Sequence, residues 1–481
     1  MSEFISRLRA LTAPLPTDTP RRWVFAPYDQ LTDRVGPLSA DPTTLGLVLV
    51  ECPGKARRRP YHRQKLALVL ANLRHFALEQ AARGVLVRHL TAPSYAEALR
   101  RLVAEVGPVT MMEAAERELR HELAPLVSEG LLHVVPHAGW LSTPEDFAAS
   151  QKPAPPWKME PFYQHLRKKT GLLMEGGKPL GGRFNFDDEN RRPWRPERGD
   201  PPAPTPPRFT PDAVTREVGT LIEEHFARHP GTLDLGALPA TQADADHLWQ
   251  WAMDACLPYF GPFEDALSTR SSGLFHTRIA PLLNLHRLLP RDIVRDVAAL
   301  PIEHPSKEGF IRQVLGWREY VHHVHRATDG FRRAPAPASA TAPHPGDGGY
   351  AGWSGAPWYL PRDGDAAVDG GACPSALGAA SPVPPAYWGT PSGLRCLDTV
   401  VADVWREGYS HHITRLMVLA NLGTTLGLSP RALTDWFWVA YTDAYDWVVE
   451  PNVLGMGTYA LGGLMTTKPY VSGAAYIDKM S

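Results

Sequence analysis

Cysteine is scarce in this chain, with only four among 481 residues. So few cysteines exclude a disulfide-stapled scaffold and favour a reducing compartment. They are Cys52, Cys256, Cys373 and Cys396, and no two of them form a Cys-x-x-Cys pair. Their spacing alone therefore indicates no metal site.

Long apolar runs and an excess of one charge are also lacking. No stretch approaches the ~18 consecutive apolar residues of a membrane span, and residues 1–16 carry Glu3, Arg7 and Arg9 where a signal peptide would be apolar. Lys plus Arg number 50 and Asp plus Glu 51, so any surface that binds nucleic acid must be local. We predict a monomeric cytoplasmic protein without membrane contact.

Proline, glycine and tryptophan are abundant instead. The 48 Pro and 40 Gly exceed the usual share of ~12%. They concentrate in the run PPAPTPP at 201–207 and in a segment with little periodicity at 331–385. The first run predicts a linker, and the second predicts a long surface insertion or lid. The chain also has 14 Trp, several of them in its last hundred residues.

The first 150 residues alternate short apolar runs with helical patterns, which is typical of a doubly wound parallel sheet. No GxGxxG follows the first strand, so a dinucleotide site of the NAD type is not supported. The predicted strands are 22–26, 45–51, 85–89, 109–113 and 131–136, and the predicted helices are 61–82, 95–106 and 115–126.

The second half of the chain has helical periodicity almost throughout. We therefore predict an α/β domain at 1–150, a linker at 151–208 and an all-α domain at 209–481 that contains the 331–385 insertion. The predicted helices are 212–229, 242–256, 279–289, 293–300, 307–325, 397–426, 430–441 and 448–461.

Two adjacent histidines, His411 and His412, fall on the predicted helix 397–426. Neighbouring helical positions point about 100° apart, so the pair cannot bind one metal ion together. Either one histidine is core and the other exposed, or one is poised for proton transfer. Arg415 follows His411 by one turn and can pair with Asp443, either as an ordinary interhelical salt bridge or as a fixed pair beside a cofactor. Periodicity alone places the nearby tryptophans in the core.

Several longer stretches, taken in order and spacing, are more specific than any single motif. Together they resemble the photolyase/cryptochrome superfamily, in its bacterial branch that carries an iron–sulfur cluster and contains (6-4) photolyases and cryptochromes. The stretches include RRWVFAPYDQL at 21–31, PLGGRFNFDDENRRPW at 179–194, YFGPFEDALSTRSSGLFHTRIAPLLNL at 259–285, WGTPSGLRCLDTVVADVWREGYSHHITRLMVLANL at 388–422 and DWFWVAYTDAYDWVVEPNVLGMGTYALGG at 435–463.

This resemblance implies a fold and two cofactors. The α/β domain would be an antenna domain with a ribolumazine-type chromophore, for which Tyr28 and Glu51 are candidate contacts. The helical domain would bind FAD. Thr277 and Arg278 fall in the segment that contacts the FAD phosphates, and Arg415 and Asp443 would form an ion pair over the flavin ring.

The resemblance also implies an activity, namely light-driven electron transfer from reduced FAD that reverses (6-4) lesions in UV-damaged DNA. His412 resembles the histidine that faces the lesion, with His411 as its neighbour. Trp436 matches the tryptophan nearest the flavin, and Trp388 matches a more distant electron donor. Basic runs at 55–63 and 191–198 are candidate phosphate contacts or solvated loops.

The chain departs from the family pattern at three places. Cys396 matches one of the four cysteines that hold the 4Fe-4S cluster, and the other three would follow Ser481, so we expect either a truncated chain, which we favour, or a lost cluster. Val449 occupies the position facing flavin N5, where the family commonly has Glu. Phe437 stands where some members have Tyr. A cryptochrome-like light sensor without repair activity, or a truncated member without the cluster, are the alternatives to a photolyase.

Overall fold

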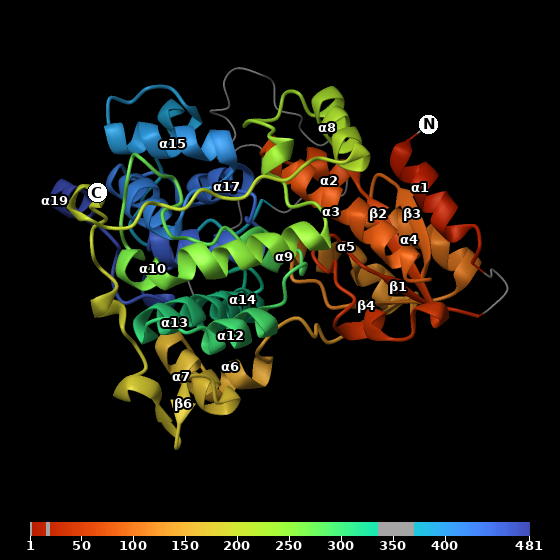
Figure 1. Cartoon of the computed structure of the whole chain (residues 1–481), viewed down its shortest axis with the longest axis horizontal. Coiled ribbons are helices and arrows are strands. Elements are labelled where there is room, and N and C mark those ends of the chain that lie inside the picture. The colour runs from red at the N-terminus through yellow and green to blue at the C-terminus, as the bar shows by residue number, and fades with distance from the viewer. Residues whose placement is uncertain (1, 16–19, 335–369) are drawn as a thin grey trace.

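The computed structural model describes residues 2–15, 20–334 and 370–481. The strands β1 to β4 lie at one end of the molecule, near the N-terminus, β6 lies apart beside α7, and the other end, where the C-terminus lies, is helical (Figure 1). In the described part of the chain, no helix is both long and apolar enough to cross a membrane.

A five-stranded parallel sheet forms the core of the N-terminal region, in the order β3-β2-β1-β4-β5. This arrangement confirms the predicted doubly wound sheet and its five strands. The order reverses between β2 and β4, on either side of β1, and such a switch point is where open α/β sheets bind ligands. The strands are β1 Arg22–Phe25, β2 Leu45–Glu51, β3 Leu86–Thr91, β4 Val109–Met112 and β5 Leu132–Val135.

Strand β2 lies inside the sheet because its sequence, LGLVLVE, is apolar at almost every position. All of its residues except the last are buried. Leu47 pairs with Val24 of β1 on one side and with Val87 of β3 on the other. A strand covered on both faces needs a continuous apolar run, and this is why periodicity identified it correctly.

Helices cover the sheet and make up most of the remaining chain. Those around the sheet are α1 Glu3–Thr12, α2 Pro53–Arg57, α3 Arg63–Ala82, α4 Tyr95–Val106, α5 Arg117–Ser128 and α6 Pro144–Ser150. Those that follow are α7 Met159–Thr170, α8 Ala213–His225, α9 Gln242–Trp251, α10 Leu257–Phe263, α11 Ala280–Asn284, α12 Pro290–Ala299, α13 His304–Ile311 and α14 Glu319–Ala327. The last are α15 Arg395–Glu407, α16 Asn421–Thr425, α17 Pro430–Ala440, α18 Asp446–Val449 and α19 Ala474–Met480.

Several α-helices continue into wider π-helical turns, which are frequent at functional sites. These turns are η7 Ala252–Cys256, η8 Arg312–Arg318, η11 Thr414–Ala420 and η12 Glu450–Gly457. A short 3-10 turn, η10 Pro385–Trp388, precedes α15. The turns η11 and η12 border the site described below.

The predicted continuous helix at 397–426 is wrong. Helix α15 ends at Glu407, and Gly408 takes a left-handed conformation with φ 63°, which a residue with a side chain adopts only at a cost. His411 lies in the irregular segment that follows, and the next helix begins at His412. The two histidines therefore occupy a helix entry, and their side chains are set by the turn at Gly408.

The segment 151–208, predicted as a linker, contains ordered structure. Helix α7 buries Phe162, Tyr163 and Leu166 in the main hydrophobic cluster, and β6 Met174–Glu175 pairs with β7 Lys178–Pro179. The three-part division at 1–150, 151–208 and 209–481 stays a prediction. The insertion predicted at 331–385 falls largely outside the described residues.

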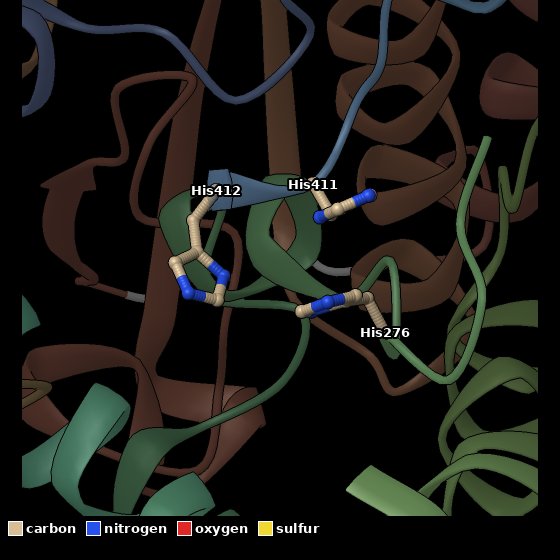
Figure 2. A group of neighbouring side chains, drawn as sticks. All are labelled: His276, His411 and His412. Carbon is tan, nitrogen blue, oxygen red and sulfur yellow. The ribbon is translucent and has the colours of Figure 1, made fainter. Parts of the chain in front are cut away.

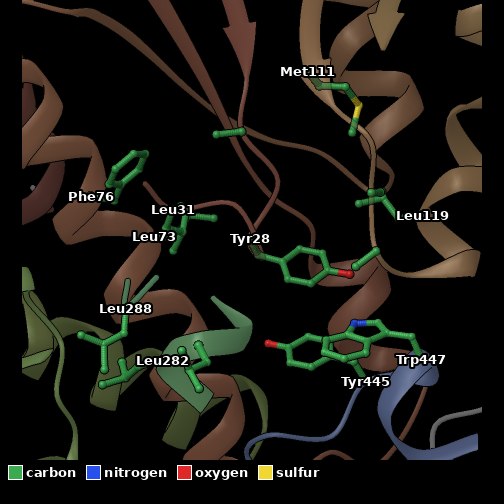
Figure 3. Packing of buried hydrophobic residues seen from close by; sticks show 14 of the residues in the cluster. Tyr28, Leu31, Leu73, Phe76, Met111, Leu119, Leu282, Leu288, Tyr445 and Trp447 are labelled. Atoms are coloured by element: carbon green, nitrogen blue, oxygen red, sulfur yellow. The ribbon is translucent and has the colours of Figure 1, made fainter. Parts of the chain in front are cut away.

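One hydrophobic cluster joins the sheet region to the helical region (Figure 3). Figure 3 shows Tyr28, from the N-terminal part of the chain, beside Tyr445 and Trp447, from the C-terminal part. The rings of Tyr28 and Tyr445 stack with centroids 6.2 Å apart. Because burial of apolar area is the main driving force of folding, this cluster fixes the two regions against each other.

We predict that Gly408→Ala destabilises the protein more than Gly171→Ala does. Both glycines end a helix in the left-handed region, and Ala there costs roughly 1 kcal/mol. A Cβ at Gly408 would also lie 2.8 Å from Cγ2 of Thr442, whereas nothing lies within 4 Å of one at Gly171. Urea unfolding measures both variants, and equal losses would contradict the close packing of the turn.

Candidate functional site

A cavity of about 280 Å³ opens within the helical region, and we call it the helix-side cavity. Five segments surround it: α10 through Phe260, 276–284 with α11, the helix α13–η8–α14, the turn 409–415 and the segment 443–452. Its walls combine aromatic side chains with a few convergent polar groups, as ligand pockets do. The lining residues include Phe260, His276, Thr277, Arg278, Asn284, Phe310, Trp317, Arg318, Tyr409, His411, His412, Arg415, Asp443, Trp447, Val448 and Asn452.

Arg415 and Asp443 form a two-pronged ion pair on the wall of this cavity. Nη1 and Nη2 of Arg415 each donate to one carboxylate oxygen of Asp443 at 3.0 Å. Nε of Arg415 donates to the carbonyl of Ser410 at 2.8 Å, and its guanidinium lies 4.0 Å from the ring centre of Tyr441. Burial acts to lower the pKa of Arg415, but the Asp443 carboxylate outweighs it and the pKa is raised. The pair is thus a fixed dipole at the cavity wall.

Thr277 and Arg278 also line the cavity, but the charge of Arg278 is already partnered. Its guanidinium donates to Glu407 at 2.7 Å and to Ser272 at 2.8 Å. It also lies 4.2 Å from the ring centre of Tyr409. An anionic ligand would have to compete with Glu407 for this guanidinium.

Three histidines meet at one side of the cavity (Figure 2). His276 and His411 lie face to face, with ring centres 4.5 Å apart and planes 8° apart, and His412 lies edge-on to His276. A metal ion binds in the plane of an imidazole ring. Since the planes of His276 and His411 are nearly parallel, these two rings cannot share one ion without turning.

The ring nitrogens of the two buried histidines of this group are enclosed by surrounding protein atoms. Both ring nitrogens of His411 and Nε2 of His276 lack a hydrogen-bond partner among the described residues. Burial lowers the pKa of His276 and of His411 well below the usual value, and neighbouring histidines add to the effect. Both rings are therefore neutral and able to donate and accept hydrogen bonds.

His412 is the most accessible of the three, with 42% of its side chain exposed. Its Nε2 lies 4.0 Å from Oδ1 of Asp265. Burial and then the Arg415 charge lower the pKa of His412, although the 42% of the side chain that is exposed to water moderates the effect of burial. The ring is thus neutral near pH 7, and an approaching anion would raise its proton affinity.

Comparison with known proteins now identifies the family. The chain is 30% identical over 476 residues to a protein named (6-4) photolyase from Agrobacterium fabrum, covering 94% of this chain and 84% of that protein. The chain belongs to the photolyase/cryptochrome superfamily. The family described as deoxyribodipyrimidine photo-lyase-related protein matches residues 22–236.

Two crystal structures share the fold of this superfamily member. A bacterial class III photolyase from Agrobacterium tumefaciens aligns with a TM-score of 0.55 at 17% identity, covering 92% of this chain and 82% of that one. A cryptochrome from Synechocystis sp. PCC6803 aligns with a TM-score of 0.55 at 16% identity, covering 91% and 82%. At these identities the likeness concerns the fold alone.

The remaining flavin-site residues predicted from the family lie behind the cavity wall. Val449 is not among the lining residues. It packs in the hydrophobic cluster around Trp436, while its neighbour Val448 and Asn452 face the cavity. Trp436 is fully buried on α17, and Trp388 is half-buried at the end of η10. Flavin contact by Val449 and electron transfer by the two tryptophans stay predictions.

A four-cysteine cluster cannot be built from the described residues. Cys396, at the start of α15, packs against the same hydrophobic cluster as Trp388 and Ile477. All four cysteines are free thiols. The His276, His411 and His412 group is the one set of potential metal ligands in the described part of the chain, and it contains no cysteine. These residues therefore do not fit a 4Fe-4S group.

A second cavity, of about 420 Å³, lies between the sheet and helices α3 and α8, and we call it the sheet-side cavity. Tyr28 and Glu51, predicted as antenna contacts, both line it. Arg74 and His89 bind the carboxylate of Glu51. Burial opposes ionisation there, but the hydrogen bonds from His89 and Arg74 prevail and lower the pKa of Glu51 to about 2. Tyr28 donates a hydrogen bond to Glu116.

The segment 441–447 separates the two cavities and contributes to both. Asp443 and Trp447 line the helix-side cavity, and Tyr445 lines the sheet-side cavity. Lys65 of α3 donates to the carbonyls of Ala444 and Trp438. Burial lowers the pKa of Lys65 to about 7. Sequence reasoning missed Lys65, because its side chain gives no local sign of burial.

In the first basic run, 55–63, three of the charged side chains are paired with carboxylates, while Arg57 is exposed, and phosphate binding by this run stays a prediction. Lys55 pairs with Glu116, and Arg58 and Arg59 pair with Glu118. The second run contains Arg191, which is 60% exposed and lies 3.7 Å from Asp265. Asp265 also approaches His412, so this carboxylate lies near both Arg191 and His412.

Sequence reasoning also missed His276, which the structure brings to the other two histidines. The signal was present, because His276 directly precedes Thr277 within a stretch that resembles the family. Trp405, one turn before Gly408, was missed as well. It contacts both Trp436 and Trp388.

We predict that Asp443→Asn lowers the free energy of unfolding by about 3 kcal/mol, because it leaves the Arg415 charge without its carboxylate in a largely buried position. Glu129→Gln is the control. It breaks the exposed pair between Arg100 and Glu129, and we expect little loss there because water screens such pairs. Urea unfolding measures the free energy of unfolding of both variants. Similar losses of this free energy in the two would refute a structural role for the Asp443 pair.

Proposed function

We propose that this protein is a flavin-dependent (6-4) photolyase, which uses light to reverse (6-4) photoproducts in DNA. The observation that carries the proposal is the shared cavity of the Arg415–Asp443 pair and the three histidines. The Arg415–Asp443 pair suits the polar edge of a flat ring, and the three histidines suit hydrogen bonding to a damaged base. The 30% identity to a protein named (6-4) photolyase supports the same choice.

The residues of the helix-side cavity suit FAD. Arg415 and Asp443 would hold the polar edge of the flavin, and Thr277 and Arg278 would contact its phosphates. Trp317 and Trp447 supply aromatic walls. Asn284 donates to the carbonyl of Asp443 at 2.9 Å and keeps that segment in place. Bound there, FAD would absorb blue light and supply one electron to the lesion.

The protein's own part in repair is to bind, orient and protonate. A lesion must leave the base stack to enter such a cavity, and damaged bases leave more readily than intact ones. Neutral His411 and His276 present unpartnered nitrogens for hydrogen bonds to the lesion. His412 stands at the exposed side, beside Asp265. We assign it the proton donated during bond rearrangement, after the negative charge of bound DNA has raised its pKa and the ring has taken up a proton. Arg191 would contact the adjacent DNA phosphate.

We further propose that the sheet-side cavity holds an antenna chromophore of the ribolumazine type. Its volume, its position at the edge of the sheet and the parallel stack of Tyr28 on Tyr445 suit a flat heteroaromatic ring. The nitrogen of the Lys55 side chain lies 4.9 Å from the ring centre of Tyr28. Lys55 could therefore donate a hydrogen bond to a polar atom of the chromophore.

We expect His412→Ala to abolish most repair of a (6-4)-containing oligonucleotide by the reduced protein under blue light. Removing a positioned proton donor costs about 10²–10⁴-fold in rate. His133→Ala, on the exposed edge strand β5, is the control and should repair normally. Wild-type repair rates in His412→Ala would overturn the assigned role. Light-driven flavin reduction without any repair by the wild type would favour a cryptochrome-like sensor.

The absorbance spectrum of the purified protein tests the two cofactors. We expect flavin bands in the blue, and their absence from wild type would refute the FAD proposal. Flavin content should fall in Asp443→Asn and persist in Glu51→Gln. If the antenna proposal holds, Glu51→Gln should lose an additional near-ultraviolet band, because that change removes a carboxylate from the sheet-side cavity alone.

A further inference from the structure

Helix α1 precedes the segment 22–236 that the family model matches, yet it packs against α3, α8 and β3. Figure 1 shows it at the strand end of the molecule. Two of its side chains, Phe4 and Leu8, are buried in the main hydrophobic cluster, and the other residues of the helix are half-buried or exposed. These two side chains therefore anchor the helix, and what each one touches decides what the helix does.

The ring of Phe4 lies against both residues that hold the carboxylate of Glu51. It meets His89 edge to face, with ring centres 4.8 Å apart and planes 83° apart, and the guanidinium of Arg74 lies 5.1 Å from its centre. Arg74 donates through Nε to Oε1 of Glu51 at 2.7 Å and through Nη2 to Oε2 at 3.1 Å. Nε2 of His89 lies 2.9 Å from Oε1. Phe4 thus backs a two-residue clamp on one carboxylate.

The first turn of α1 also holds Arg74 from its other side. Nη1 of Arg74 donates to Oε1 of Glu217 at 2.8 Å. The hydroxyl of Ser2 donates to the same oxygen at 2.6 Å, and the backbone N–H of Phe4 donates to Oε2 at 3.2 Å. The start of a helix carries partial positive charge, which favours a carboxylate there. The helix therefore fixes the guanidinium through its ring contact and through Glu217 together.

The clamped carboxylate belongs to the sheet-side cavity. Glu51 is the last residue of β2 and lines that cavity, and the side chains of Glu51, Arg74 and His89 are at most 10% exposed. Among the described residues, Oε2 of Glu51 accepts one hydrogen bond, from Arg74. A carboxylate oxygen can accept two, so Oε2 retains a place for a donor inside the cavity. Hydrogen bonds gain strength where water is excluded, and Phe4 excludes it from behind.

We propose that Phe4 is a positioning residue of the sheet-side cavity. Its ring keeps the Arg74–His89 clamp dry and so holds the Glu51 carboxylate in one orientation for a hydrogen-bond donor on a bound flat heteroaromatic ring, such as the imide N–H of a ribityllumazine. Helix α1 is then a working part of that cavity. The proposal rests on the antenna site proposed above.

Binding of dimethyl-ribityllumazine to the full-length protein, followed by its fluorescence, tests the effect on a ligand. We expect Phe4→Ala to weaken binding at least about tenfold, because a hydrogen bond to a charged acceptor loses its fixed geometry. Flavin content should stay at the wild-type value. Leu8→Ala is the matched control. It removes a buried side chain one turn, or about 6 Å, further along the same helix, and should bind like the wild type.

The control separates positioning from anchoring. Equal weakening in Phe4→Ala and Leu8→Ala would mean that the helix acts through its anchoring alone, and would overturn the proposal. Phe4→Leu restores an apolar side chain behind the clamp and should recover most of the affinity. An affinity in Phe4→Leu as low as in Phe4→Ala would contradict the exclusion of water by this residue.

A measurement without ligand keeps this proposal distinct from the antenna proposal. In protein labelled with ¹⁵N-arginine, the Nε–H of Arg74, assigned with Arg74→Lys, should exchange slowly with water in the wild type and in Leu8→Ala, and fast in Phe4→Ala. Fast exchange in the wild type, or slow exchange in Phe4→Ala, would overturn the proposal. If exchange follows the expectation but the wild type binds no ribityllumazine, the antenna proposal fails and the positioning of Glu51 stands.

Glu217→Gln covers the case in which Phe4→Ala does not fold. It keeps the Phe4 ring and removes the negative charge through which the first turn of α1 holds Arg74. The Arg74 Nε–H should then exchange faster than in the wild type, and binding of the ribityllumazine should weaken. Wild-type exchange in Glu217→Gln would contradict the role of the helix in fixing the guanidinium.

Discussion

The amino group of Lys65 is enclosed between aromatic rings and donates hydrogen bonds to the carbonyls of Ala444 and Trp438. The rings of Tyr61 and Tyr445 lie 4.7 and 4.9 Å from its nitrogen. This contact attaches helix α3, beside the sheet, to the segment 441–447 of the helical region. That segment presents Asp443 to one cavity and Tyr445 to the other. Both candidate cofactor sites therefore depend on where a single buried lysine holds the backbone.

The two ends of the helix-side cavity carry different polar groups. At one end the Arg415–Asp443 pair is fixed by Ser410, Tyr441 and Asn284, so a bound ring would meet a dipole that needs no rearrangement. At the other end, neutral histidines with unpartnered nitrogens adjoin the exposed His412. Behind the wall, η10 carries the carbonyl that orients Trp405 and Trp436. The ion pair, the histidines and the indole rings are thus held by different elements around one space.

Where prediction from sequence succeeded, local pattern and tertiary environment agree. The strand β2 is apolar throughout and is buried on both faces. The Arg415–Asp443 pair is present as expected, because η11 and the turn after α17 are adjacent in the fold. Prediction failed where the environment overrides the pattern. Gly408 breaks a periodic helix through its left-handed backbone. In the basic run at 55–63, Lys55, Arg58 and Arg59 pair with Glu116 and Glu118, which lie just before and at the start of α5.

The amino-acid sequence by itself determined the order of strands and helices, the superfamily and the residue types of the candidate site. These follow from apolar periodicity and from motif order, which are local properties of the chain. Only the tertiary structure decided that His276 joins His411 and His412, that Val449 faces the core and that Trp405 bridges two tryptophans. Those relations join residues far apart along the chain or depend on the direction of a side chain, and packing alone sets both.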